Sequence, residues 1–122
     1  MKRAIFTFYN LSLDTDIVRL QADVVKKFNT TADFLPLCSN THGEEVIHPD
    51  AVDYGFNQLF VEQKYDTVLL LDVDCIPLNS YALEYTFEQA EKGKLIGNVQ
   101  RGMHLDNDEH NYVAPSAFCL TR

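Results

Sequence analysis

Leu69 to Leu78, LLLDVDCIPL, places two carboxylates directly after the most apolar run of the chain. The run from Thr67 to Leu71 has the length of a strand and the continuous apolar character that is typical of a strand covered on both faces. Asp72 and Asp74 follow where this strand leaves the core. Because open α/β sheets bind ligands at the carboxyl ends of their strands, the stretch predicts both a central strand and a ligand site at its end.

Outward from this strand, strand patterns and helix patterns alternate along the chain. This order predicts an α/β fold, with a mostly parallel, Rossmann-like sheet and helices on both faces. The predicted strands are Arg3 to Tyr9, Thr31 to Cys38, Thr67 to Leu71, Leu95 to Val99 and Ser116 to Thr121, with a further short strand at Glu45 to Ile47.

Three helices are predicted from apolar spacing and from their ends. The first begins near Asp14 and carries Ile17, Leu20, Val24, Val25 and Phe28 at helical spacing. The second begins at Pro49, a residue favoured at the first helical position, and has Val52, Phe56, Leu59 and Phe60 on one face. The third begins at Asn79 or Ser80 and ends near Lys92, with Leu83, Phe87 and Ala90 inward and Gly93 in a left-handed position.

Composition restricts the classes of function. The 122 residues fit one domain, 1–122, and 18 acidic against 10 basic residues give a formal charge of −8. A protein that binds nucleic-acid backbones needs a positive face, so no nucleic acid is expected as a partner. No run approaches the length of a membrane span, and three widely spaced cysteines suit free thiols in the cytoplasm.

The D-x-D pattern itself is weak evidence, because the chain contains it three times. Asp14 and Asp16 stand at a helix start, where acids favour the helix dipole, and Asp106 and Asp108 stand in a predicted polar loop. A calcium loop starting at Asp106 is excluded because Asn111 and Ala117 occupy the positions that need Gly and Glu. The remaining pair follows a buried strand and precedes an Ile-Pro turn, and an extended backbone would point both of its carboxylates to one side.

At this point the sequence resembles a known family. GFNQLFVEQKYDTVLLLDVDCIPLN, residues 55–79, is similar to the glycosyltransferases of the GT-A fold, in which an Asn-containing helix leads through a KYD turn into a strand and D-x-D-x-x-P. The likeness covers most of the chain in the order of its elements, and Asn57 to Asn79 as a motif. It implies a GT-A type sheet and transfer of a sugar from a nucleotide-diphosphate sugar donor to an acceptor that the sequence does not identify.

The resemblance also implies residue roles. Asp72 and Asp74 would hold Mn²⁺ or Mg²⁺ against the donor diphosphate, with Asp74 as the direct ligand and Asp72 more often on the ribose or a metal-bound water. The segment Thr7, Phe8, Tyr9 and Asn10 matches the place where the family holds base and ribose, and Asn57 belongs to the motif helix. In the family a later His completes the metal shell, and the catalytic base and acceptor pocket lie in a C-terminal half. We therefore expect more polypeptide after Arg122, and we assign no catalytic base.

Three other interpretations stay open. The two carboxylates could cap the following helix and bind loop amides, Phe8 and Tyr9 could be core aromatics, and His104, His110 and Arg101 could be surface residues. A haloacid-dehalogenase-like phosphotransferase also places D-x-D after an apolar strand, but that motif wants Thr or Val where Ile76 stands. A non-enzymatic module that binds a nucleotide, or assembles as a homo-oligomer, is the third interpretation.

Overall fold

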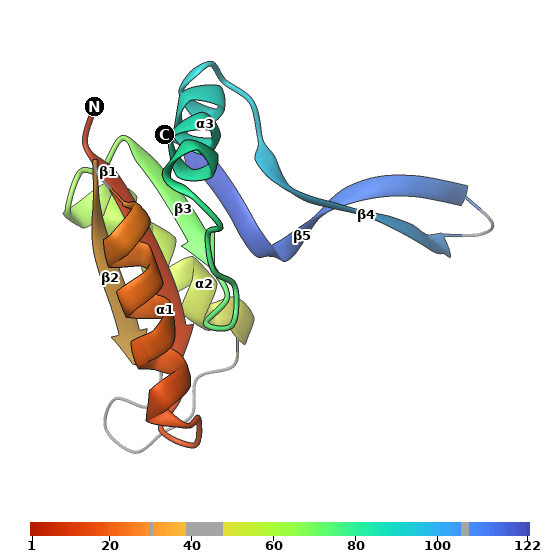
Figure 1. The fold of residues 1–122 in the computed structure, drawn as a ribbon. Helices are drawn as coiled ribbons and strands as arrows, with labels where there is room; N and C mark the ends of the chain where they lie inside the picture. The colour runs from red at the N-terminus through yellow and green to blue at the C-terminus, as the bar shows by residue number, and fades with distance from the viewer. Residues whose placement is uncertain (30, 39–47, 106–107) are drawn as a thin grey trace.

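The computed structural model describes the backbone of residues 1–29, 31–38, 48–105 and 108–122, and the side chains of these ranges except 48–49, 99–105 and 108–116. The predicted short strand at Glu45 to Ile47 lies outside the described residues. The described chain forms a sheet with the strand order β2-β1-β3-β5-β4, and helices cover both of its faces (Figure 1). The elements are β1 (Arg3–Tyr9), α1 (Thr15–Phe28), β2 (Ala32–Cys38), α2 (His48–Phe56), the π-helix η2 (Asn57–Glu62), β3 (Thr67–Leu71), α3 (Ser80–Glu91), β4 (Ile96–Leu105) and β5 (Asp108–Thr121).

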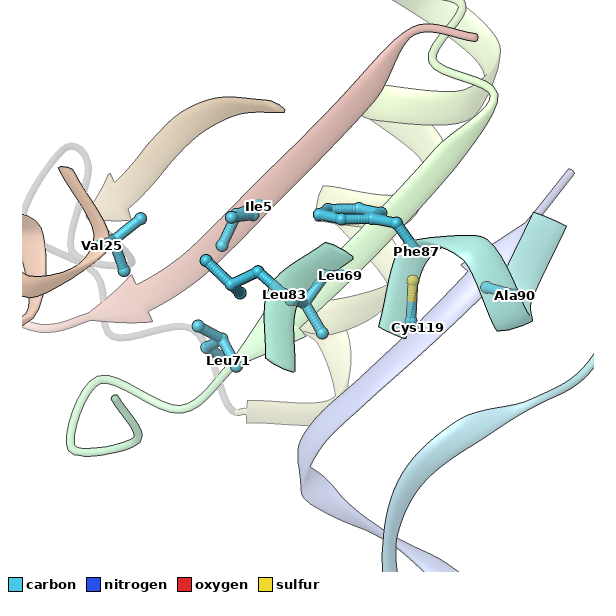
Figure 2. Packing of buried hydrophobic residues seen from close by; sticks show 8 residues of the cluster. All are labelled: Ile5, Val25, Leu69, Leu71, Leu83, Phe87, Ala90 and Cys119. Atoms are coloured by element: carbon cyan, nitrogen blue, oxygen red, sulfur yellow. The ribbon is translucent and has the colours of Figure 1, made fainter. Parts of the chain in front are cut away.

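The central strand β3 is buried at every position, as its apolar run predicts. Its odd and even side chains point to opposite faces of the sheet, so each face has its own core. On the face covered by α1 and α3, Leu69 and Leu71 pack with Phe87 and the residues around it (Figure 2). On the other face, Val68 and Leu70 pack with Leu59 of η2 and its neighbours. The prediction of an α/β fold is therefore confirmed.

The sheet is mixed, so the prediction of a mostly parallel sheet is not confirmed. β1 pairs in parallel with β2 and β3, whereas β5 pairs antiparallel with both β3 and β4. The predicted last strands, Leu95 to Val99 and Ser116 to Thr121, are parts of a long hairpin whose distal half projects from the domain (Figure 1). The interpretation of the segment that contains Asp106 and Asp108 as a polar loop is wrong from Asp108 onward, because cross-strand pairing extends to Leu105 opposite Asp108.

The hairpin changes register where β5 contains a proline. Gly97 pairs with Phe118, but Val99 pairs with Val113. Between these two pairs β5 therefore contains three more residues than β4. Pro115 lies within it and has no N–H to donate, which makes it tolerable only at an irregularity of this kind. From sequence propensity alone, Pro115 and the polar residues before it are predicted to form a loop.

Helix ends follow the sequence closely. Asp14 caps α1, where its Oδ1 accepts from the Asp16 amide at 2.9 Å, and Asn79 caps α3 by accepting from the Ala82 amide at 2.8 Å. Gly93 has a φ of 81°, the left-handed conformation that ends α3. The first D-x-D pair is thus a helix cap.

The inward face of α1 differs from the one that its apolar spacing suggests. Leu20 is 58% exposed and Ile17 is also exposed, whereas Gln21 and Val25 are buried against the sheet. Val25 and Phe28 pack on the core as their spacing predicts, so the difference is confined to the first half of the helix. The burial of a glutamine requires a polar partner, and the candidate site below provides it.

An ionic cluster joins β1 to α3 at the amino end of the sheet. Arg3 Nε and Nη2 donate to the two carboxylate oxygens of Glu91 at 2.6 and 2.8 Å, and Nη1 donates to Glu84 at 2.9 Å. The Arg3 side chain is 14% exposed, and its guanidinium lies 5.1 Å from the centre of the Phe87 ring. The hydrogen bond from Arg3 lowers the pKa of Glu91, against the opposing effect of burial.

The face covered by α2 depends on a close helix-strand approach. A Cβ at Gly55 would lie 2.7 Å from Phe6 Cε2 and 2.7 Å from Phe8 Cζ, closer than carbon atoms approach in proteins. Phe6 is buried and packs edge-to-face on Phe8 and on Phe56, with ring centres 5.3 and 5.1 Å apart. A glycine at this position therefore lets α2 lie directly on the rings of β1.

We expect Arg3→Met to lower the free energy of unfolding by about 1–3 kcal/mol, since it leaves two partly buried carboxylates without their cation. Arg19→Met is the matched control, because the Arg19 to Asp16 pair is exposed and 3.9 Å long. Denaturant unfolding near neutral pH measures both. The contribution of ionised Glu91 to the free energy of unfolding is complete above the ordinary carboxyl pKa of about 4.3 and is lost as pH falls through the lowered pKa of the folded state. Acidification should therefore reduce the difference in stability between Arg3→Met and the unchanged chain. Equal stability of the two variants would contradict the cluster's role.

We expect Gly55→Ala to destabilise the domain by about 1–2 kcal/mol, because overpacking costs about 1–3 kcal/mol while a helical alanine recovers up to about 1 kcal/mol. Asp53→Ala, at an exposed position of the same helix, gives the propensity effect without the clash. Urea unfolding of both variants checks the difference. A Gly55→Ala protein at least as stable as the Asp53→Ala control would show that α2 can move away without loss.

Candidate functional site

The carboxyl ends of β1 and β3 lie side by side at the point where the chain's connections diverge. From β1 the chain leads through α1 to β2 on one side, and from β3 it leads through α3 to β4 and β5 on the other side (Figure 1). Open α/β sheets bind ligands outside the carboxyl ends of their strands, commonly at such a switch point. Asp72 and Asp74 follow β3 at this place, as the sequence predicts.

The two carboxylates lie in a tight turn rather than in extended backbone. The Cys75 amide donates to the Asp72 carbonyl at 2.8 Å, which closes a four-residue turn from Asp72 to Cys75. The extended geometry expected from the sequence is therefore wrong here. Asp72 is half-buried and Asp74 is exposed, so the second carboxylate is the more accessible to a ligand.

Gln21 of α1 holds this turn, and the sequence analysis missed it. Its Nε2 donates to the Asp72 carbonyl at 2.7 Å and to the Cys75 carbonyl at 2.8 Å. Gln21 is 1% exposed, and it lies one helical turn before Val25, which packs in the core beneath. One sequence feature indicates that Gln21 is buried: it stands four residues before Val25, on the same face of the helix.

The carboxylates of Asp72 and Asp74 both lie close enough to the Cys75 thiol to change its pKa. Burial raises the pKa of the Cys75 thiol, and the negative charges of Asp72 and then Asp74 raise it further. The thiol therefore stays protonated, and the two carboxylates provide the local negative charge. A divalent cation that binds here would be attracted by both charges.

The donor chemistry at the turn fits Mn²⁺ or Mg²⁺. Carboxylate oxygens are hard ligands, and Mg²⁺ sites in phosphate-binding proteins commonly use one or two carboxylates, with phosphate and water oxygens completing the shell. Within the described part of the chain, no three His, Cys, Asp or Glu side chains gather as a candidate metal group. A cation at Asp72 and Asp74 would accordingly complete its shell with water oxygens, or with phosphate oxygens when a phosphate is bound.

The predicted nucleotide segment at the end of β1 is only partly accessible. Thr7 is fully buried, Phe8 is half-buried and packs on Phe6, and Tyr9 is half-buried. The Asn10 side chain is half-buried and accepts from the Ser12 amide at 3.1 Å, which shapes the loop toward α1. Tyr9 and Asn10 therefore offer the accessible surface of this segment, while Thr7 is enclosed in the sheet.

Asn57 is exposed at the start of η2. This helix covers the face of the sheet opposite to α1, so Asn57 and Gln21 belong to different layers. η2 has the wide i to i+5 pattern, with the Gln63 amide donating to the Gln58 carbonyl at 2.9 Å. The two carboxylates and the end of β1 thus lie at the carboxyl ends of neighbouring strands, whereas Asn57 lies on the helix that covers the face opposite to α1.

A cavity of about 210 Å³ is lined by Ile76 and Pro77, the two residues that directly follow the D-x-D turn. It lies between α3 and the bases of β3, β4 and β5. Most of the side chains around it are apolar, including Leu71, Ile76, Pro77, Leu83 and Phe118. Because Ile76 and Pro77 directly follow Cys75, the cavity adjoins the candidate site.

Several residues considered from the sequence are not placed. The side chains of Arg101, His104 and His110 lie outside the described residues, so the interpretation of them as surface residues stays a prediction. Among the described residues, no helix is long and apolar enough to cross a membrane. Comparison of the chain with protein-family models and with curated proteins gave no match.

Proposed function

We propose that this chain is the donor-binding domain of a metal-dependent glycosyltransferase of the GT-A type. The observation that carries the proposal is the position of the Asp72 and Asp74 turn, at the carboxyl end of a fully buried strand and beside the switch point between β1 and β3. This is where a nucleotide finds free backbone groups and strand ends. The ligand is a nucleotide-diphosphate sugar, and the acceptor is a second, unassigned molecule.

The accessibility of each carboxylate supports its assigned role. Asp74 is exposed and would contact Mn²⁺ or Mg²⁺ directly. Asp72 is half-buried, and its backbone is held by Gln21, which suits a contact with the ribose or a metal-bound water. Tyr9 and Asn10, at the end of β1, would face the nucleoside, with Thr7 and Phe8 supporting them from the core.

The chemistry follows from the charge of the leaving group. A bound divalent cation would stabilise the negative charge that accumulates on the diphosphate as the sugar bond breaks. The chain's own residues would bind and orient the donor: Asp74 and Asp72 hold the charged end, and the β1 loop holds the nucleoside. Orientation at fixed distance is itself a large source of rate acceleration.

A module that binds a nucleotide or assembles with like chains, without transfer, is the second candidate. Exposed apolar side chains at the start of α1 favour it, namely Leu11, Ile17 and Leu20. An interface between two copies would cover such residues. Detection of bound nucleotide without hydrolysis or transfer, together with a mass that grows with concentration, would select this candidate.

We place the protein in a reducing compartment, the cytoplasm. Cys38, Cys75 and Cys119 are free thiols. Burial is the main cause that raises the pKa of Cys119 to about 12, so this thiol is inert as well as reduced. Free, unpaired cysteines are typical of chains that do not meet an oxidising environment.

We expect Asp74→Asn to abolish metal-dependent donor binding, because it removes the exposed carboxylate that would contact the cation. The measurement is calorimetric titration of UDP and of GDP into the purified chain, with Mn²⁺ and with a chelator. Because the Asp74 side chain is exposed, we expect the variant and the unchanged chain to unfold at the same temperature. Asp16→Asn is the matched control, because it alters an exposed Asp of another D-x-D pair that serves only a helix start.

Equal affinity of the Asp74→Asn variant and the unchanged chain would refute the metal site. Binding that survives the chelator would instead assign the nucleotide to the strand ends alone. If neither nucleotide binds in any condition, the D-x-D segment is a structural turn and the proposed function is wrong.

A further inference from the structure

The side-chain amide of Gln21 is oriented by its partners. Both contacts of its Nε2 are backbone carbonyl oxygens, at 2.7 Å to Asp72 and 2.8 Å to Cys75. Carbonyl oxygens only accept, so only the NH₂ end of the amide can face them. The two N–H groups thus contact the first and the last residue of the turn that carries both carboxylates.

These bonds add little to overall stability. The stability gained from two neutral hydrogen bonds is of the same order as the cost of one buried acceptor without a partner. Among the described residues, Gln21 Oε1 is such an acceptor, and Thr7 Oγ1, at the end of β1, is a second buried oxygen without a hydrogen bond. The favourable and unfavourable contributions are of the same size, so stability alone gives no reason to bury a glutamine here.

The contribution of Gln21 is therefore to the shape of the turn. The carbonyl of Asp72 accepts from both the Cys75 amide and Gln21, and the carbonyl of Cys75 accepts from Gln21. With the peptide groups at both ends fixed, the backbone of Val73 and Asp74 between them has few alternatives. The direction of the Asp74 side chain follows from that backbone.

We propose that Gln21 is a positioning residue that holds the Asp72 to Cys75 turn in the conformation in which both carboxylates serve one divalent cation. The presence of a cation depends on the proposed function, whereas the role of Gln21 in holding the turn depends only on its hydrogen bonds. Groups that orient metal ligands without touching the metal typically change metal affinity by about 10–100-fold when they are removed. Gln21 would act on the ligands through their backbone, from a helix 51 residues earlier in the chain.

The test uses Gln21→Met, which keeps the length of the side chain and removes both hydrogen bonds. Gln89→Met is the matched control, because Gln89 is also a buried glutamine on a helix and its Oε1 bonds to Lys94 at 2.7 Å, at the far end of α3. Gln21→Asn, whose amide is too short to reach both carbonyls, is a second variant if the methionine prevents folding. Thermal unfolding establishes that each variant is folded.

Two readouts separate the turn from the metal. Amide hydrogen exchange at Cys75, whose N–H closes the turn, should be at least about tenfold faster in Gln21→Met than in the unchanged chain and in Gln89→Met. Titration with Mn²⁺ alone should show affinity weaker by about tenfold or more in Gln21→Met only. A role confined to stability would move neither readout beyond the control.

The outcomes distinguish this inference from the proposed function. Unchanged exchange at Cys75 overturns the holding of the turn, and unchanged Mn²⁺ affinity beside faster exchange overturns the positioning of the ligands. If the unchanged chain binds no Mn²⁺, the metal site and the positioning of its ligands both fail, while the Cys75 exchange still decides whether Gln21 holds the turn.

Discussion

The burial of β3 on both of its faces is the constraint on which the structure depends. A strand of five apolar or β-branched residues cannot expose either face, so one layer of helix must lie on each side. α1 and α3 cover Leu69 and Leu71 (Figure 2), and α2 with η2 covers Val68 and Leu70. The neighbouring strand β1 is buried in the same way from Ala4 to Thr7, which makes these two strands the centre of the sheet.

The same constraint fixes where charge can appear. A carboxylate inside either core would be unpaired and very costly, so the first Asp comes where β3 leaves the core. The chain must then turn, because the next element is α3 on the face already occupied by α1. The D-x-D turn connects β3 to α3 for this reason, and it contacts α1 through Gln21.

Local signals in the sequence predict the elements near this centre accurately. β1 has the predicted bounds, β3 has them as well, and Asn79 and Gly93 mark the start and the end of α3 as expected. Each of these depends on residues close together in the chain. Their reasons are apolar runs, caps and a left-handed glycine, which act within a few residues.

The failures occur where distant parts of the chain meet. The β4 to β5 hairpin is held by cross-strand pairing that local propensity does not contain, and its proline is accommodated by a change of register. The orientation of α1 follows a hydrogen bond to residues more than 50 positions later, which overrides the spacing of Leu20 and Ile17. The turn at Asp72 is closed by the same contacts. The candidate carboxylates were therefore predictable as residues, but their geometry and the residue that holds it were not.

The two ends of the central strands are held by different chemistry, and the difference agrees with a cation site. At the amino end, the positive charge of Arg3 is matched by Glu84 and Glu91. At the carboxyl end, a neutral amide holds the turn. An Arg or Lys at position 21 could also donate to the two carbonyls, but its charge would offset the carboxylates and weaken the attraction for a cation. An aliphatic residue would pack as well and leave the turn unheld. Among these alternatives, only the neutral amide gives a fixed turn without adding a positive charge beside Asp72 and Asp74.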